Sequence, residues 1–112
     1  MKSIDAATAE HYNWGAACDG WHLVRNEELS VIEERMPSAT EEQRHWHEQS
    51  RQFFYVLEGE LTMQFDDGPV VLRAREGIEI EPGSPHQAKN CSGADVRFLV
   101  ISQPTSRGDR HI

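Results

Sequence analysis

Residues 44–61 read RHWHEQSRQFFYVLEGEL and place two histidines, His45 and His47, just ahead of a run of aromatic residues. In a β-strand, residues two apart point to the same face, so these imidazoles are predicted to lie side by side, about 6–7 Å apart along the chain. That spacing suits chelation of a metal ion. A third histidine, His86, follows the segment EPGSP, whose glycine and prolines predict a rigid bend. Spacing alone leaves a second interpretation open, in which the histidines only satisfy hydrogen bonds.

Turn residues interrupt the rest of the chain at short intervals, and strand-length segments lie between them. These segments are rich in β-branched and aromatic residues, and none has the length or period of a helix. They span residues 20–26, 29–36, 52–58, 60–65, 70–73, 77–81 and 96–102. Short strands at regular spacing predict an all-β sandwich or barrel.

The strand at residues 52–58 has apolar residues on both of its faces, which is unusual for a small barrel. The two sets are Phe54 and Val56, on the face of Gln52, and Phe53, Tyr55 and Leu57 on the other. A single small barrel covers one face only. We therefore predict a homodimer in which a second subunit covers the other face.

Composition limits the remaining possibilities. The 112 residues suit one domain, with a core at about residues 20–102 and polar arms at both ends. A formal net charge of −8, with the eleven Lys and Arg scattered singly, argues against a nucleic-acid partner. No apolar run approaches a membrane span or a signal peptide, so a cytoplasmic protein without membrane contact is expected. Two distant cysteines, Cys18 and Cys91, predict free thiols.

The stretch HWHEQSRQFFYVLEG resembles the first sequence motif of the cupin superfamily. That motif reads HxH, three or four residues, Glu, six residues, Gly. The chain supplies His45, His47 and Gly59 in register and departs at one position, where Gln52 stands in place of the usual Glu.

The stretch REGIEIEPGSPHQAKN is similar to the second cupin motif, Gly, five residues, PxGxxHxxxN. Gly83, His86 and Asn90 are in register, whereas Arg75 replaces the leading Gly and Glu81 the first Pro. The two motifs occur in the expected order, and the resemblance covers about residues 29–102. It identifies the chain as a small single-domain cupin of the conserved-barrel (cupin 2) type.

This resemblance implies a fold and a metal site. The fold is a double-stranded β-helix, or jelly roll, with a metal ion held inside the barrel. Carried over position by position, the implied ligands are His45, His47, His86 and Gln52. The amide oxygen of Gln52 can bind a metal but brings no charge. Alternatively, Gln52 stands off and water completes a site of three histidines.

An imidazole-rich site with an open position suits a divalent transition metal. Fe, Mn or Ni is expected first, and Zn, Co or Cu also fits such ligands. If Gln52 points inward, Phe54 and Val56 do as well, and Met63 and Phe98 are candidates on neighbouring strands. These four are expected to line a substrate pocket, the alternative being plain barrel core.

We expect a metal-dependent enzyme that acts on a small oxygenated molecule chelated at the metal. Dioxygenase-like oxidoreductase chemistry is placed first, closely followed by isomerase or lyase chemistry. A non-catalytic binding or sensing cupin and a metal-free barrel are the alternatives.

Two features of the sequence bear on further site residues. Glu33, Glu34 and Arg35 lie on one strand, and only one parity of that strand faces inward. The C-terminal segment SRGDR is either a polar tail or an arm that crosses to a partner subunit, where Asp109 and Arg110 would close the pocket mouth.

Overall fold

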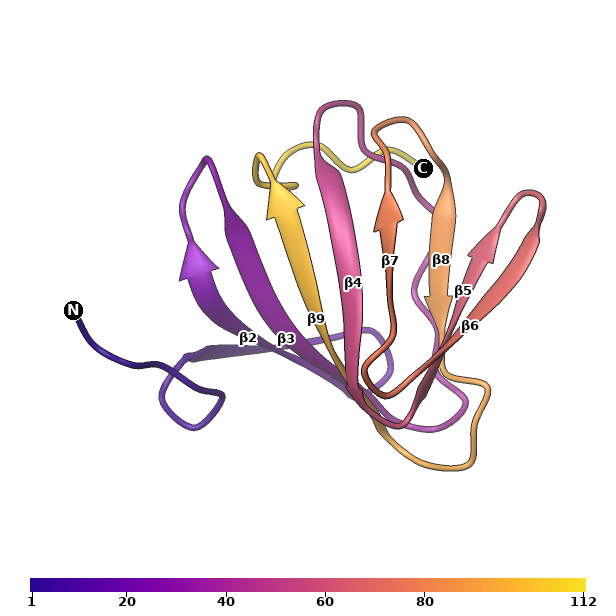
Figure 1. Ribbon diagram of the computed structural model, residues 1–112, viewed down its shortest axis with the longest axis horizontal. Coiled ribbons are helices and arrows are strands. Elements are labelled where there is room, and N and C mark those ends of the chain that lie inside the picture. The colour runs from indigo at the N-terminus through magenta and orange to yellow at the C-terminus, as the bar shows by residue number, and fades with distance from the viewer.

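Nine β-strands make up the computed structural model, which describes residues 1–112 (Figure 1). No helix in it is long and apolar enough to cross a membrane. The strands are β1 (Glu10–Trp14), β2 (Cys18–Arg25), β3 (Ser30–Met36), β4 (Arg51–Glu58), β5 (Glu60–Phe65), β6 (Gly68–Arg73), β7 (Gly77–Ile80), β8 (His86–Lys89) and β9 (Val96–Gln103).

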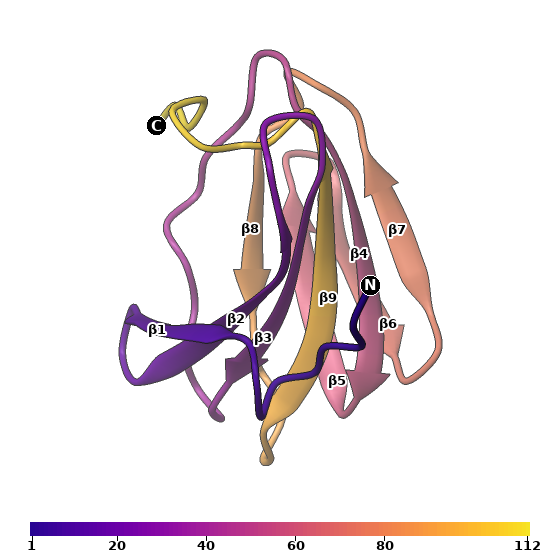
Figure 2. The same cartoon turned by 90° about the vertical axis from the view of Figure 1, so that its left-hand side faces the viewer.

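The strands form two antiparallel sheets that face each other (Figure 2). The larger has the order β1-β2-β3-β9-β4-β7 and the smaller the order β6-β5-β8. Twelve buried hydrophobic residues fill the space between them. They are Cys18, Met36, Phe54, Val56, Leu61, Met63, Leu72, Ile80, Ala88, Val96, Phe98 and Val100. This arrangement is the predicted all-β jelly roll.

The register of the large sheet places its inward-facing side chains in rows. Directly opposed residues of antiparallel strands share a face, so each row runs across β3, β9 and β4. The rows are Ser30, Ser102 and Gln52; Ile32, Val100 and Phe54; and Glu34, Phe98 and Val56. The first row is polar, the second is apolar, and the third places Glu34 beside two apolar residues.

All seven predicted strands are present, with ends that differ by one or two residues. Two further strands, β1 and β8, were not predicted. The sequence of β8, HQAK, is short and polar, and that of β1, EHYNW, lies in a segment expected to be an arm. Both strands form because a neighbouring strand supplies backbone partners, β2 for β1 and β5 for β8.

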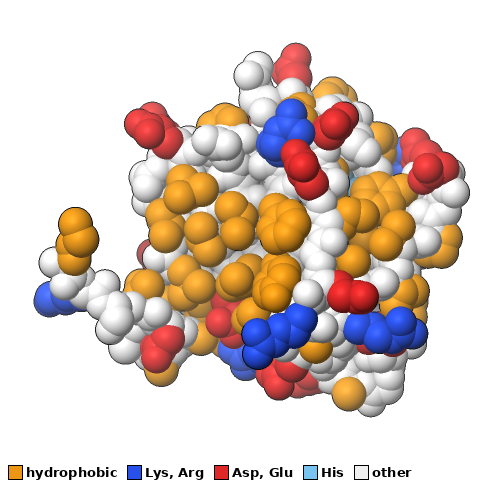
Figure 3. Space-filling view, viewed as in Figure 1, with side chains coloured by type: hydrophobic (Ala, Val, Ile, Leu, Met, Phe, Trp, Pro, Cys, Tyr) orange, Lys and Arg blue, Asp and Glu red, His pale blue; other side chains and the backbone are white.

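The outer face of the large sheet is apolar where β3, β9 and β4 meet. Phe53 lies opposite Ile101, and Tyr55 lies opposite Leu99. Figure 3 shows hydrophobic side chains gathered over this part of the molecule. Phe53 and Leu57 are 38% and 39% exposed, so no other part of the chain covers this face.

After β9 the chain crosses the open end of the barrel and ends beside the loop that precedes β4 (Figures 1 and 2). The backbone N–H of Thr105 donates to the carbonyl of Glu27 at 3.0 Å. Trp46 and His111 exchange two backbone hydrogen bonds of 2.9 Å, and their rings stack. Residues 103–112, hereafter the tail, are thus fixed along their length to the same barrel.

Candidate metal centre

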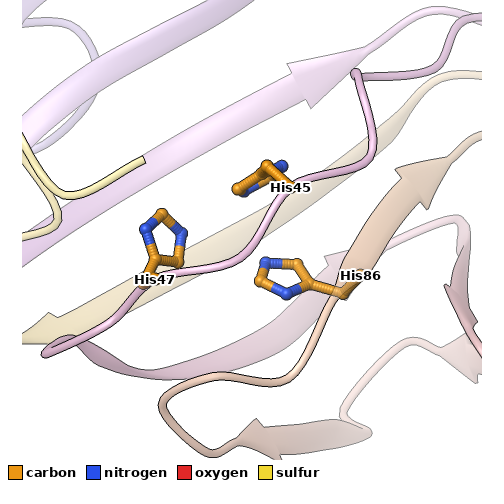
Figure 4. Close-up of side chains that lie close together, drawn as sticks. All are labelled: His45, His47 and His86. Carbon is orange, nitrogen blue, oxygen red and sulfur yellow. The ribbon is translucent and has the colours of Figure 1, made fainter. Parts of the chain in front are cut away.

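His45, His47 and His86 converge inside the barrel, near its open end (Figure 4). One ring nitrogen of each histidine lies within 4.8 Å of the corresponding nitrogens of the other two. His45 and His47 belong to the loop before β4, and His86 begins β8. All three side chains are buried. Three imidazoles from two segments thus surround one small volume, as a metal site requires.

The loop that carries His45 and His47 differs from the sequence prediction in one respect. It is extended, but it joins β8 and the tail through isolated bridges and not through a regular strand ladder. His45 pairs with His86, and Trp46 pairs with His111. Alternation is retained all the same, because His45 and His47 point inward whereas Trp46 stacks outside on the tail.

Each of the three rings donates a hydrogen bond from Nδ1 to a backbone carbonyl. The acceptors are Gln43 for His45 at 2.8 Å, Asp109 for His47 at 2.6 Å and Ser84 for His86 at 2.9 Å. With the proton on Nδ1, the lone pair is on Nε2. The Nε2 atoms of His47 and His86 are buried and have no hydrogen-bond partner. Such orientation by a backbone carbonyl is typical of histidines that bind metals.

Burial also keeps the three imidazoles neutral. The pKa of His45 is lowered to about 3, mainly by removal from water; the neighbouring His86 and Arg110 act in the same direction, and the hydrogen bond to Gln43 opposes them. The pKa values of His47 and His86 are lowered as well, again mainly by burial. Neutral imidazole is the form that binds a metal ion.

Gln52 lies beside the histidines on β4. Its Nε2 donates to the hydroxyl of Ser102 at 3.0 Å, which leaves Oε1 buried and without a hydrogen-bond partner. A buried carbonyl oxygen without a partner is costly unless something binds it. Three imidazole nitrogens and one amide oxygen form a donor set that fits a divalent transition metal. Coordination by Gln52 stays a prediction.

A cavity of about 140 Å³ opens beside these groups. Of the predicted pocket residues, Phe54 lines this cavity. Val56, Met63 and Phe98 do not, because each is fully buried in the hydrophobic core at 0% exposure. The alternation of side chains along a strand correctly predicted that these three residues face the inside of the barrel. It does not give their depth, and these three lie farther from the open end than the histidines.

Two acidic side chains, those of Glu34 and Glu42, also line the cavity. The sequence left the orientation of Glu34 undecided and gave no sign of Glu42. Glu34, on β3, points inward, whereas Glu33 pairs with Arg97 on the outside at 2.6 Å. Burial, with the nearby charge of Glu42, raises the pKa of Glu34 to about 8. Burial raises the pKa of Glu42 to about 7, although the backbone N–H of Ala88 donates to it at 2.9 Å. The inward parity of β3 was the only available signal.

Tyr12 of β1 completes this side of the cavity. Its hydroxyl lies 3.5 Å from Oε2 of Glu34. The ring lies across Gly20 of β2, where a Cβ atom would overlap it. Only glycine at this position lets a side chain from β1 reach over β2 to β3. Burial and the Glu34 carboxylate both raise the pKa of Tyr12.

The tail lies against the cavity of its own subunit, where the sequence left both a polar tail and an arm crossing to a partner open. Arg110 lines the cavity. The carboxylate of Asp109 accepts backbone hydrogen bonds from Glu48, Gln49 and Ser50 at 2.9, 2.9 and 3.0 Å. Partial burial alone would raise the pKa of Asp109, but these donors outweigh it and lower the pKa to about 2. Asp109 thus holds the loop of His47 through both its backbone and its side chain.

Two curated proteins match the sequence over part of their length. An uncharacterized protein of Methanocaldococcus jannaschii is 25% identical over 83 residues, 74% of this chain and 66% of that protein. The polyketide synthase CurC of Streptomyces cyaneus is 32% identical over 60 residues, 54% of this chain and 39% of that protein. The chain therefore spans less than two thirds of the length of either relative.

Solved structures match over nearly the whole chain. A sugar phosphate isomerase from Silicibacter pomeroyi is 21% identical with a TM-score of 0.81, over 93% of this chain and 76% of that one. The polyketide cyclase RemF from Streptomyces resistomycificus is 21% identical with a TM-score of 0.81, over 94% and 80%. A predicted oxalate decarboxylase from Thermotoga maritima is 16% identical with a TM-score of 0.84, over 93% and 100%. At these identities the likeness establishes the fold.

The family model described as the cupin domain matches residues 31–102, which contain both histidine motifs and nine of the residues that line the cavity. Together with the two-sheet barrel and the three converging histidines, this match confirms the resemblance found in the sequence: the chain belongs to the cupin superfamily.

Proposed function

We propose that this protein is a metal-dependent enzyme that transfers protons on a small oxygenated organic molecule, as isomerases and lyases do. The observation that carries the proposal is the position of Glu34. Its carboxyl group lines the same cavity as His45 and His47, and its raised pKa lies close to neutral pH. A general acid or base works best when its pKa lies near the working pH.

The donor set described above would hold the metal. His45, His47 and His86 supply Nε2 atoms, and Gln52 supplies Oε1. A divalent ion in such a site acts as a Lewis acid that polarises a carbonyl oxygen and stabilises negative charge developing there. Because all four ligands are neutral, the charge of the ion is not compensated by the protein, which favours an anionic or bidentate oxygen ligand.

Glu34 takes part as a carboxylate that accepts a proton from the carbon next to the substrate carbonyl. The electron pair of the broken C–H bond forms the C=C bond of an enolate, and the carbonyl oxygen takes the negative charge. Where the deprotonated carbon carries a hydroxyl group, the hydroxyl proton moves to the former carbonyl oxygen, and return of the proton from Glu34 to the former carbonyl carbon completes an isomerisation of a keto-sugar without net oxidation. Tyr12 stands 3.5 Å from Glu34 and can donate a hydrogen bond to its carboxylate.

The comparisons are consistent with this range of chemistry. Proteins with the same fold are described as a sugar phosphate isomerase, a polyketide cyclase and a predicted oxalate decarboxylase. Those activities belong to those proteins. They support proton transfer on oxygen-rich small molecules as the first reaction class to test here, ahead of the dioxygenase chemistry that the sequence placed first.

Exchange of substrate hydrogen for deuterium is the direct test. Purified protein of known metal content is incubated in D₂O with β-diketones and keto-sugars, and NMR follows the loss of hydrogen next to the carbonyl. We expect Glu34→Gln to abolish this exchange while retaining the metal. Glu33→Gln, the neighbouring carboxylate on the outer face, is the matched control and should exchange at the wild-type rate.

Three outcomes would contradict the proposal. Oxygen consumption with catechols or flavonols, without deuterium exchange of any compound, would establish the dioxygenase alternative. Saturable binding without turnover would indicate a sensing or binding cupin. Equal exchange by wild type and Glu34→Gln would remove Glu34 from the mechanism.

A further inference from the structure

A second and larger cavity, of about 380 Å³, lies next to the metal cavity. Its walls come from the turn between β2 and β3 on one side and from the tail on the other. The side chains that matter here are His22, Arg25, Ser30, Thr105, Ser106 and Arg107. Every lining residue except Ile32 has a polar or charged side chain, so the cavity offers groups that can bind a polar ligand.

Two arginines give the cavity a positive character. Arg25 pairs with Glu10 at 3.2 Å, but the side chain of Glu10 is 69% exposed and lies outside the cavity lining. Arg107 makes no ion pair. One carboxylate, Glu27, is among the lining residues. The guanidinium group of Arg107 is therefore available to a ligand, and the charge of the Arg25 guanidinium is only weakly compensated by Glu10. Two such groups favour the binding of an anion.

His22 adds a buried group that lacks a partner. Its Nδ1 is inaccessible to solvent and makes no hydrogen bond. Burial, together with the charges of Arg25 and Arg107, lowers the pKa of His22, so the ring is neutral. Because Nδ1 is closed off from the cavity, the donor that the neutral ring offers to an anionic oxygen is Nε2–H. The hydroxyl groups of Ser30 and Ser106 supply further donors on the same walls.

The walls are held in place by backbone hydrogen bonds. In the turn, the side-chain oxygen of Asn26 accepts from the N–H groups of Glu28 and Leu29 at 3.0 and 2.9 Å. The N–H of Thr105 donates to the carbonyl of Glu27 at 3.0 Å, which joins the tail to the turn. Arg107 follows directly, with its N–H 3.3 Å from the hydroxyl oxygen of Thr105. The site is thus prearranged in the protein, which lowers the entropic cost of binding.

The two cavities are adjacent. Ile32 and Ser106 line both of them. Ile32 belongs to the inward row next to that of Gln52, and His22 lies opposite Ile32 on β2. The two cavities therefore share the wall that Ile32 and Ser106 form.

We propose that the cavity of Arg25, Arg107 and His22 binds the anionic group, a phosphate or a carboxylate, of a molecule whose oxygenated end reaches the three histidines. The second half of this statement rests on the proposed function above, whereas the anion site does not. The proposal narrows the substrate class. Besides the oxygens that chelate the metal, the molecule carries an anionic group that fits the neighbouring cavity.

The test uses metal-free protein, so that anions cannot bind to the metal. Inorganic phosphate and acetate are titrated separately at constant ionic strength, and backbone ¹H–¹⁵N NMR locates the binding. We expect saturable shifts in residues 22–30 and 104–107. Binding should be about tenfold weaker in Arg107→Ala and at least as weak in Arg107→Glu, because a charge-assisted hydrogen bond is lost. Arg107→Lys should recover part of the affinity.

Arg73→Ala is the matched control, since this exposed arginine lies on β6 in the other sheet. It should bind both anions as the wild type does. Tighter binding of phosphate than of acetate would point to phosphate esters, and the reverse order to carboxylic acids. Absence of saturable shifts with either anion, or equal binding by wild type and Arg107→Ala, would overturn the inference.

The failure of the proposed function would look different. If the protein takes up no metal or exchanges no deuterium while phosphate still binds beside Arg107, the anion site stands and the enzymatic proposal falls. If exchange is observed but no anion binds here, the enzyme acts on uncharged molecules.

Discussion

At the scale of single residues, the metal centre depends on where each imidazole proton is held. His45, His47 and His86 all donate Nδ1–H to a main-chain carbonyl, so the backbone fixes both the ring orientation and the tautomer. Main-chain acceptors remain in place when a side chain elsewhere is replaced. The Nε2 lone pairs therefore face the cavity before any ion is bound.

Removal of one imidazole should abolish metal binding. We expect protein purified without added metal or chelator to carry a near-stoichiometric divalent ion by elemental analysis, and His45→Ala and His86→Ala to carry only background amounts. A site with three protein ligands loses most of its affinity for the metal when one of the three is removed. His11→Ala is the control, because His11 pairs with Asp19 near the protein surface. If both cavity variants retain their metal, the site lies elsewhere.

Gln52→Glu should make the stability of the protein more dependent on metal. A carboxylate at this buried position lacks a cation in the metal-free protein, so the variant should unfold at a lower temperature than wild type. With a divalent ion present it should bind at least as tightly as the wild type and regain stability, while its affinity for anionic ligands changes. Thermal unfolding with and without metal measures both effects. Identical behaviour of the two proteins would mean that Gln52 is not a ligand.

At the scale of structural elements, the sequence predicts best what depends on local pattern. The seven predicted strands have alternating or continuous apolar residues between clear turns, and all seven are present. β1 and β8 lack that pattern, because their stability comes from pairing with β2 and β5. The three histidines were predictable because both motifs surround them in sequence.

Residues whose role depends on register or depth were not predictable in the same way. Glu34 faces the cavity and Glu33 does not, and this distinction requires the pairing of β3 with β9. Val56 shares a face with Phe54 and both belong to the core, but only Phe54 also lines the cavity. Contacts of the tail, such as Asp109 with the loop of His47, join residues about sixty positions apart and leave no periodic signal.

Asp109→Asn should weaken the attachment of the tail. The carboxylate accepts three backbone N–H groups, and an amide presents its own N–H₂ to one or two of them. We expect a loss of about 1–3 kcal/mol in the free energy of unfolding at neutral pH. The lowered pKa of Asp109 means that its contribution is present above about pH 4 and is lost as the pH falls toward 2.

Chemical denaturation of wild type and variant between pH 7 and 3 measures this difference, which should shrink with acidification. Asp66→Asn is a suitable control, because Asp66 forms an exposed pair with Arg44. A constant difference across this range would show that the Asp109 carboxylate is not responsible.

At the scale of the whole molecule, the exposed apolar face of the large sheet is the strongest indication of self-association. Phe53, Tyr55, Leu99 and Ile101 form a continuous surface on an acidic protein that otherwise carries charged groups outside. A second copy presents the same apolar surface, so pairing through a twofold axis would bury both. This keeps the homodimer expected from the doubly apolar β4 as a prediction.

Light scattering coupled to size-exclusion chromatography should give the mass of a dimer for the wild type. Phe53→Lys should shift the mass to that of a monomer, because a charge in an apolar interface is costly. Val71→Lys is the control, since Val71 is similarly exposed but belongs to β6 in the other sheet. A monomeric wild type at all concentrations would refute the prediction.

The loop that carries His45 and His47 is joined to the rest of the barrel by isolated bridges, two to β8 and one to the tail. Segments held by few backbone hydrogen bonds open locally at a smaller free-energy cost than the strands of a continuous ladder. Amide hydrogen exchange in residues 41–50 should therefore be faster than in β3, β9 and β4. An ion that binds only the closed loop would slow this exchange as its occupancy rises. Metal ions would then enter and leave the site through local opening of this loop, and the rate of opening would limit the rate of metal release.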